Sequence, residues 1–158
     1  MTRRLASLGA AVFLATSPLA GQAGVPRIAL LTFTASPESL LPDARAIESG
    51  VRESMRGNPG LLLVPGPALT ATQQDSLRAA VRRDTLQGPA YFVGGILTTR
   101  SDGRVELIFR AQDVRVENIV AGQRLAAPTV AELHADPDSL VAKLLRDIAT
   151  SRARRRGR

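Results

Sequence analysis

One short segment of the sequence gathers residue types that could bind a metal ion. Glu132, His134, Asp136 and Asp138 occupy every second position. Carboxylate and imidazole groups are common ligands of divalent cations, and alternate residues of a loop can converge on one ion. A structural interpretation competes with this one, because Thr129 and Glu132 have the spacing of a capping box and the two aspartates open a helix, where negative charge is favourable. Capping explains most of the cluster, so we predict no metal site.

Other constellations that carry chemistry are sparse. His134 is the only histidine, no serine lies in a nucleophile-elbow pattern, and cysteine is absent. Gly94 and Gly95 follow a strand, but no Gly-x-Gly-x-x-Gly or Gly-Lys-Ser/Thr pattern accompanies them. We therefore interpret these glycines as allowing a bulge or close packing in a sheet. No pair of acids stands out, and the sequence predicts no catalytic residue, no cofactor and no enzymatic activity.

The positive charge of the chain lies at its two ends. The net charge is +7 and the isoelectric point is about 11.4. Residues 1–23 carry two arginines and no acid, residues 152–158 carry five arginines and no acid, and the segment between them is neutral. A neutral body and a terminal run without aromatic residues argue against nucleic acid as the partner.

The first 23 residues have the pattern of an export signal. Arg3 and Arg4 precede the apolar run 5–15, and small residues lie at Gly21 and Ala23. Pro18 interrupts the apolar run, which is shorter than the roughly 20 residues that a membrane span needs. We predict a signal peptide over 1–23, cleavage after Ala23, and a periplasmic or secreted protein. No lipobox cysteine follows the apolar run.

The first half of the body alternates between strands and helices. An apolar run over 27–33 predicts a strand buried on both faces. Helical periodicity follows over 42–56, with its acids and arginines away from the apolar stripe, and residues 61–64 predict a second short strand. A second helix is expected over about 72–84, capped by Thr72, with three inward-facing residues: Leu77, Ala80 and Val81.

The second half predicts an antiparallel meander. Residues 90–100 and 104–114 are β-rich, and Ser101-Asp102-Gly103-Arg104 is a hairpin signal. A turn at 115–118 leads to a third strand over 119–125, and a closing helix begins after Asp136. The order is βαβα, three strands and a helix. It predicts an α/β fold: a compact sandwich with a mixed sheet of about five strands.

Several segments resemble the TolB amino-terminal-like domain and the related CsgG, FlgO and LpoB-type envelope domains. The similar segments read IALLTF, RGNPGLLLVPG, YFVGGIL and RVELIFRAQD, and they span about 26–150. The matching positions are Phe33, Tyr91, Gly94 or Gly95, and Asp113, whereas Thr32 replaces the usual proline and Val116-Glu117 replaces the usual Thr-Gly. We expect a stand-alone domain without a propeller or repeat array. The resemblance implies a small, stand-alone envelope domain that contacts other proteins.

Two functions follow from these patterns. In the first, residues 24–151 form a non-enzymatic domain that acts as an interaction or assembly accessory in the envelope, through an exposed sheet edge. In the second, a disordered basic tail over 152–158 binds an anionic lipid or lipopolysaccharide surface. The arginines that would make this second contact are Arg152, Arg154, Arg155, Arg156 and Arg158.

Overall fold

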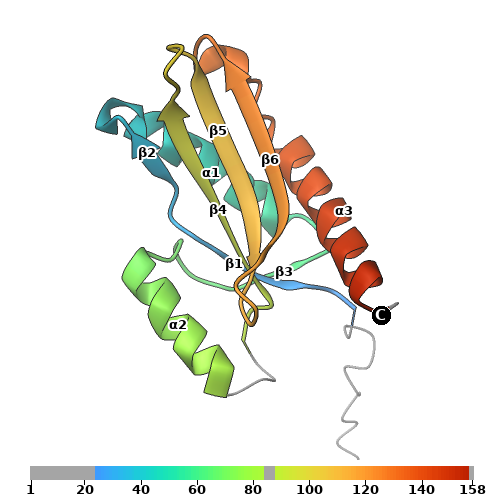
Figure 1. The fold of residues 1–158 in the computed structure, drawn as a ribbon. Helices are drawn as coiled ribbons and strands as arrows, with labels where there is room; N and C mark the ends of the chain where they lie inside the picture. Colours follow the sequence, from blue (N-terminus) through green and yellow to red (C-terminus); the bar gives the residue numbers. More distant parts are fainter. Residues whose placement is uncertain (1–23, 84–87, 157–158) are drawn as a thin grey trace, which may run out of the picture.

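The computed structural model describes residues 24–83 and 88–156, where six strands form one mixed sheet (Figure 1). The strand order is β3-β1-β4-β5-β6, with β2 also paired to β4. The strands are β1 (Arg27–Leu30), β2 (Thr34–Ser36), β3 (Leu62–Leu63), β4 (Tyr91–Thr99), β5 (Val105–Asp113) and β6 (Ile119–Ala127). The predicted α/β fold with a mixed sheet is confirmed. The predicted signal peptide lies outside the described residues.

The sixth strand arises because the first predicted strand is split in two. β1 pairs in parallel with both β3 and β4, and β2 pairs in parallel with β4 only. Between them, Leu31 bridges to Leu69 and the Phe33 amide donates to a carboxylate oxygen of Glu48 at 2.9 Å. Before the break this segment therefore pairs with both β3 and β4, and after the break it pairs with β4 alone.

The predicted meander is confirmed. β4 and β5 pair antiparallel from Tyr91↔Asp113 to Thr99↔Val105, and β6 pairs antiparallel with β5. The hairpin between β4 and β5 turns at Asp102 and Gly103, and Gly103 has a φ of 81°. This left-handed conformation costs glycine little, which is why the sequence signal was reliable here.

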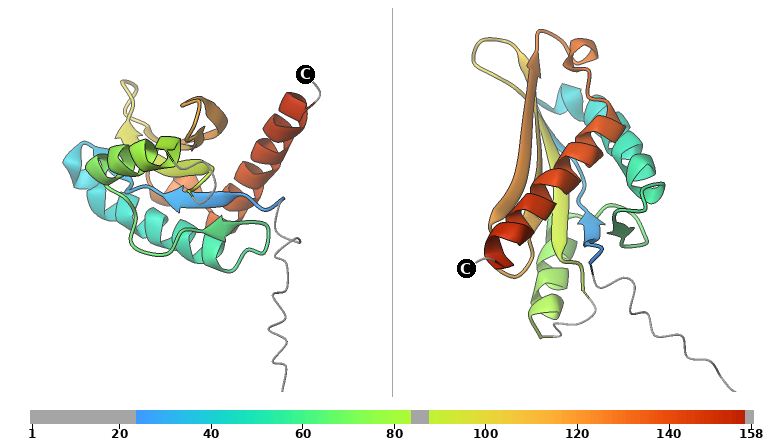
Figure 2. Two further views of the ribbon diagram at one scale, coloured as in Figure 1. Left: turned by 90° about the horizontal axis from the view of Figure 1, so that it is seen from below. Right: turned by 90° about the vertical axis from the view of Figure 1, so that its right-hand side faces the viewer.

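Two helices cover one face of the sheet and a third helix covers the opposite face (Figure 2). α1 (Leu41–Arg56) and α3 (Pro137–Arg156) enclose the main core, while α2 (Ala71–Arg83) lies over a smaller cluster. The main core includes Phe33, Phe109 and Leu144, all fully buried. α2 reaches only the lower end of the sheet as drawn in Figure 1. The upper part of the α2-side face of β4, β5 and β6 has no helix over it.

α2 differs from its prediction at its start and on one face. It begins at Ala71, and its capping contacts join Thr70 to Gln73, so the predicted cap at Thr72 is wrong. Thr70 and Gln73 form a reciprocal capping box, in which the Gln73 side chain accepts from the Thr70 amide. Val81 is buried as predicted, but Ala80 is exposed. The side of α2 that faces the sheet runs through Leu77, Arg78 and Val81, and Ala80 lies off it.

α3 extends through Arg156. Most of the segment predicted as a disordered basic tail is therefore helical, and that part of the prediction is wrong. The helix continues for about two turns beyond Ile148, its last buried apolar residue. Within residues 24–83 and 88–156, no helix is long and apolar enough to cross a lipid bilayer.

Candidate functional site

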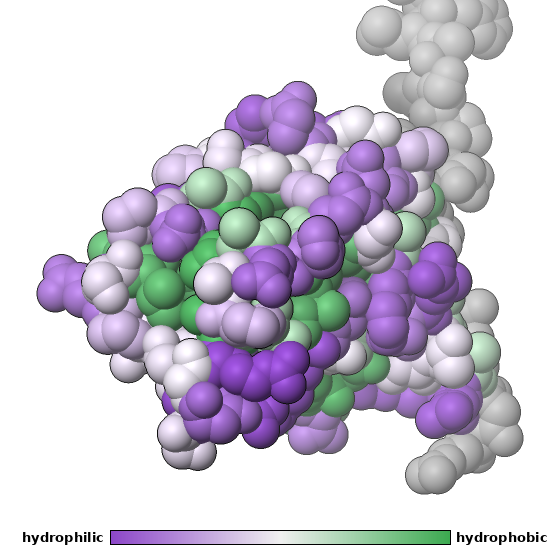
Figure 3. All heavy atoms as spheres, turned by 90° about the horizontal axis from the view of Figure 1, so that it is seen from above, coloured by the Kyte–Doolittle hydropathy of each residue, from purple (hydrophilic) through white to green (hydrophobic). Residues whose placement is uncertain are grey.

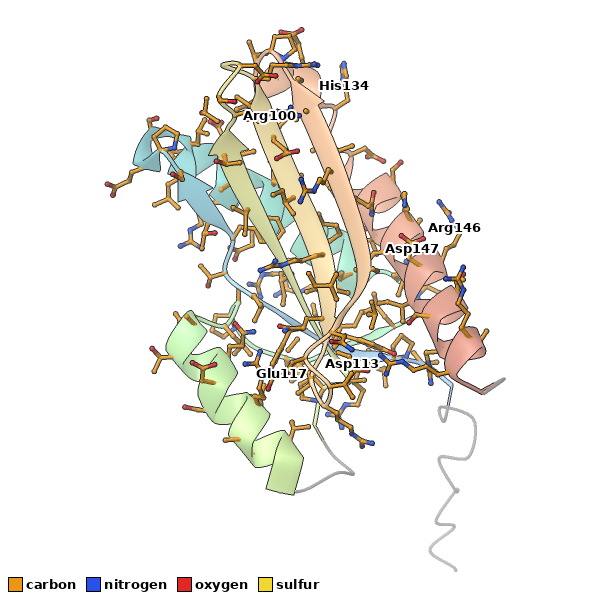
Figure 4. The ribbon with its side chains drawn as sticks, viewed as in Figure 1. Arg100, Asp113, Glu117, His134, Arg146 and Asp147 are labelled. Carbon is orange, nitrogen blue, oxygen red and sulfur yellow. The ribbon has the colours of Figure 1, made fainter. Side chains whose placement is uncertain are left out.

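In the segment that could have bound a metal ion, Asp136 caps α3, whereas the side chains of Thr129 and Glu132 bond to each other and do not form the predicted capping box. Asp136 accepts a hydrogen bond from the Ser139 amide at 2.9 Å. The Ser139 side chain and then its amide lower the pKa of the Asp136 carboxyl by hydrogen bonding. Thr129 donates to Glu132 at 2.8 Å, beside the short helix η2 (Ala131–Leu133). His134 lies at the top of the molecule and points away from the sheet (Figure 4). In the described ranges, no three His, Cys, Asp or Glu side chains gather as a metal site would require.

The paired glycines of β4 serve close packing, as the sequence analysis proposed. A Cβ atom at Gly95 would collide with the ring of Phe33, and one at Gly94 would lie 3.2 Å from the Cβ of Leu31. The Phe33 ring packs in turn against Phe109, with ring centroids 6.0 Å apart. Gly95 therefore makes room for Phe33, which lies in the break between β1 and β2.

Glu48 is a buried carboxylate that the sequence analysis placed on the polar side of its helix. Only 8% of its surface is exposed. One oxygen accepts from the Phe33 amide and from Arg45, both at 2.9 Å, and Arg52 lies 3.4 Å from the other oxygen. The sequence contained a signal for this carboxylate, because Arg45 lies three residues before Glu48 and Arg52 lies four residues after it, which are the spacings of ion pairs along a helix. The three contacts give Glu48 a structural role at the strand break.

Asp113 organises the turn between β5 and β6. Its Oδ1 accepts from the amides of Arg115 and Val116, at 2.9 and 3.2 Å. Its Oδ2 accepts from Arg155 of α3 at 2.8 Å. Figure 4 shows Asp113 and Glu117 together at this turn. The aspartate of the family resemblance thus fixes a turn and fastens the end of α3.

Two of the five predicted surface-binding arginines are engaged within the protein. Arg152 donates to the Gly24 carbonyl at 2.7 Å, and Arg155 pairs with Asp113. Arg154 is exposed and has no hydrogen bond or ion pair with the part of the chain that the structure describes. Arg156 ends α3, and Arg158 lies outside the described residues. Of the three arginines whose side chains the structure describes, Arg152 and Arg155 are therefore engaged within the protein and Arg154 is not.

The neighbourhood of Arg152 and Arg155 also contains Tyr91. This side chain is 6% exposed, and burial raises the pKa of its hydroxyl above 10.0. The positive charge of Arg152 acts in the opposite direction, the negative charge of Asp113 raises the pKa, and Arg155 lowers it. The buried hydroxyl and the arginines thus form one electrostatic unit where α3 meets the start of β4.

The clearest interaction surface is the outer edge of β6. Among the described residues, β6 pairs only with β5, so the other side of this nine-residue strand is a free edge. The opposite edge is much shorter, since β3 has two residues. A long free edge offers a row of backbone donors and acceptors to which an extended peptide can pair.

Apolar side chains and a groove accompany this edge. Ile119 is 58% exposed and Val116, in the preceding turn, is 50% exposed. A hollow of about 550 Å³ separates the first half of β6 from the last turns of α3. It is lined on the strand side by residues 118–122 and on the helix side by Asp147, Thr150, Ser151, Arg154 and Arg155. Figure 4 places Asp147 on the side of α3 near this strand and Arg146 farther out. We call the free edge and this hollow the β6 surface.

Comparison with known proteins gives matches among solved structures only. No family model and no curated protein matches the chain. The PelC dodecamer from Paraburkholderia phytofirmans aligns at 18% identity and a TM-score of 0.44, covering 80% of this chain and 86% of that one. TolB from Acinetobacter baumannii aligns at 19% identity and a TM-score of 0.47, covering 77% of this chain and 28% of that one.

A third match is the LpoB C-terminal domain from Escherichia coli. It aligns at 10% identity and a TM-score of 0.40, covering 66% of this chain and 83% of that one. TolB and the LpoB type are the groups that the sequence itself resembles, and at these identities the likeness concerns the fold.

Proposed function

We propose that this chain is an exported, non-enzymatic envelope domain that acts as an interaction or assembly accessory, and that an extended segment of a partner protein binds to the β6 surface. The observation that carries this proposal is the free outer edge of β6, a nine-residue strand. Backbone pairing along such an edge supplies affinity, and pockets for alternate side chains supply selectivity.

The apolar residues at the start of β6 support the same proposal. A single exposed apolar side chain is ordinary on a protein surface, but here two large ones flank a strand edge and a hollow. Ile119 and Val116 would anchor the partner segment, and the groove beside α3 would receive its side chains. No conformational change of the sheet is needed, since the edge is already exposed.

In-cell photo-crosslinking tests this proposal. A photoreactive amino acid is placed at Ile119, and a matched control carries it at Leu62, which is 36% exposed on β3 at the opposite edge. We expect one defined partner to be captured from position 119 and not from position 62. The substitution Val116→Asp should abolish that capture without unfolding the domain, because its side chain is exposed. Equal capture at both positions, or capture unaffected by Val116→Asp, would contradict the proposal.

The second candidate function is binding of the basic segment to an anionic surface. Arg154 supports it, because this side chain is exposed and has no partner among residues 24–83 and 88–156. Arg152 and Arg155 support it less, because each already donates to an acceptor in the protein. The first candidate therefore has the broader structural basis.

A further inference from the structure

A second hollow lies on the sheet face that α1 and α3 leave open. It has a volume of about 270 Å³ and is enclosed by β2, the first turn of α2, and the central strands β4 and β5. Its lining includes apolar groups from Leu31 and Ile96 and polar groups from Thr34, Gln74 and Arg110. This hollow is separate from the β6 surface, since the two share no lining residue.

Among the described residues, Arg110 is the only charged one that lines this hollow. It is exposed, and it has no hydrogen bond or ion pair with any of the residues that the structure describes. Its cross-strand neighbours are Gly94 on β4 and Gly122 on β6. Neither neighbour has a side chain that could pack beside the guanidinium. The space over Gly94 is occupied by the side chain of Leu31, whereas a Cβ at Gly122 would meet only the Phe109 carbonyl oxygen at 4.0 Å, so the open space lies on the Gly122 side.

Two further polar groups face the hollow without protein partners. In residues 24–83 and 88–156, the hydroxyl of Thr34 and the side-chain amide of Gln74 make no hydrogen bond. Gln112, by contrast, accepts from Arg78 at 3.3 Å and donates to the Glu117 carbonyl at 2.8 Å. The available donors therefore come from three separate elements, β2, α2 and β5.

We infer that this hollow is a binding site for a small organic carboxylate with an apolar body. Convergent polar groups at the mouth of a partly apolar hollow are typical of a small-molecule site. The planar guanidinium of Arg110 would pair with the carboxylate through two parallel N–H···O bonds. Thr34 and Gln74 can donate to the same group, and Leu31 and Ile96 would contact the apolar part. The volume is slightly below the usual range of roughly 300–1,000 Å³, which favours a ligand with few atoms.

Nuclear magnetic resonance of the exported domain tests this site, with hexanoate as the probe. We expect hexanoate to shift the amide signals of Thr34, Gly94 and Gly95, and hexanol, which has no charge, to leave them in place. Arg110→Gln should weaken hexanoate binding by about tenfold or more, because one charge-assisted bidentate pair is lost.

Arg124→Gln is the matched control. Arg124 lies on the adjacent strand β6 and its side chain is 72% exposed. It does not line the hollow. We expect this variant to bind hexanoate as the unaltered domain does. The inference is overturned if hexanoate shifts no lining residue, if hexanol shifts them equally, or if the two arginine variants weaken binding to the same extent. Because the readout is independent of the β6 surface, it succeeds or fails separately from the proposed function.

Discussion

Gly95 and Phe33 form the contact that seats the broken first strand on the centre of the sheet. The ring lies where a Cβ at position 95 would be, and it also meets Phe109 in the core. An added methyl group in such a packed place forces side chains off their rotamers or shifts the backbone. This contact explains why a glycine and a phenylalanine occur at these two positions of the family-like pattern.

We expect Gly95→Ala to lower the free energy of unfolding by about 1–3 kcal/mol, the usual cost of overpacking. Denaturant unfolding followed by circular dichroism measures the change. Gly122→Ala is the control on the same sheet, because its nearest obstacle is the Phe109 carbonyl oxygen at 4.0 Å. The effect of Gly95→Ala should shrink in a Phe33→Leu background. Equal stability of the Gly95→Ala and Gly122→Ala variants would contradict this account.

Tyr91 offers a second test at the scale of one residue, through pH. Burial raises the pKa of its hydroxyl above 10.0, so the folded protein holds this proton more tightly than the unfolded chain does. The resulting stability is complete below about pH 10 and is lost as the pH rises through the folded-state pKa. The chain has one tyrosine and no tryptophan, so the near-ultraviolet absorbance of tyrosinate reports Tyr91 alone.

We expect the absorbance titration of the folded protein to have its midpoint above that of the denatured protein. Asp113→Asn should lower the folded midpoint, because the negative charge that raises the pKa is removed. Arg155→Gln should raise it, because a positive charge is removed. The free energy of unfolding of the Tyr91→Phe variant should not show the decrease at alkaline pH that ionisation of Tyr91 causes in the unaltered protein. A folded midpoint at or below the denatured one would show that the hydroxyl is not desolvated.

At the scale of elements, α2 is attached to the sheet less extensively than the other two helices. Among its described side chains, α2 buries only Val81 in the small core cluster, with Leu77 half-buried against it, whereas α3 buries Leu140, Val141, Leu144 and Ile148. Polar contacts add to this attachment, since Arg78 lies 5.6 Å from the centre of the Phe92 ring and donates to Gln112.

We therefore expect the amides of α2 to exchange with solvent faster than those of α1 and α3. Local opening requires less energy where fewer apolar contacts must be broken. Hydrogen exchange followed by mass spectrometry measures this directly. Val81→Ala should increase exchange in α2 and leave α1 unchanged, whereas Val51→Ala should affect the main core. Protection of α2 equal to that of α1 would contradict the expectation.

The elements that the sequence predicted well are those whose signals are local. The hairpin at Asp102 and Gly103 and the cap at Asp136 depend on neighbouring residues only. The break in the first strand depends instead on Glu48 of α1 and on the Phe33–Gly95 contact with β4, which are distant in sequence. The cap of α2 was missed by two residues because threonines occur at both 70 and 72, and the spacing of Thr70 and Gln73, which is that of a capping box, was overlooked in favour of Thr72.

The candidate sites divide in the same way. The capping interpretation of the 129–138 segment is confirmed at Asp136, which accepts from the Ser139 amide. It is wrong for Thr129 and Glu132, because these two side chains bond to each other and the N-cap of η2 is Val130, with no side-chain cap hydrogen bond. The hollow at Arg110 has no sequence signal, because it requires the registers Gly94↔Arg110 and Arg110↔Gly122 to place two glycines beside one arginine. The β6 surface was expected only as an unspecified sheet edge.

At the scale of the whole molecule, some of the arginines that give the carboxyl end its positive charge also make contacts that hold the fold together. Arg152 contacts the Gly24 carbonyl, and Arg155 contacts Asp113, so the last turns of α3 hold the first described residue and the β5–β6 turn. Deleting residues 152–158 would thus remove charge and fold contacts together. A cleaner experiment keeps Arg152 and Arg155 and neutralises the other three arginines.

We expect truncation after residue 151 to lower the unfolding temperature, because a largely buried Asp113 loses its charged partner at a cost of about 1–2 kcal/mol. That cost corresponds to a shift of roughly 3–8 °C for a domain of this size. The triple variant Arg154→Gln, Arg156→Gln, Arg158→Gln should unfold at the same temperature as the unaltered protein, since Arg154 has no partner among residues 24–83 and 88–156. Differential scanning calorimetry measures both.

Cosedimentation of the triple variant with vesicles containing anionic lipid then tests surface binding on an intact fold. If the triple variant unfolds as early as the truncated chain, the contacts of Arg152 and Arg155 do not account for the stability of this end.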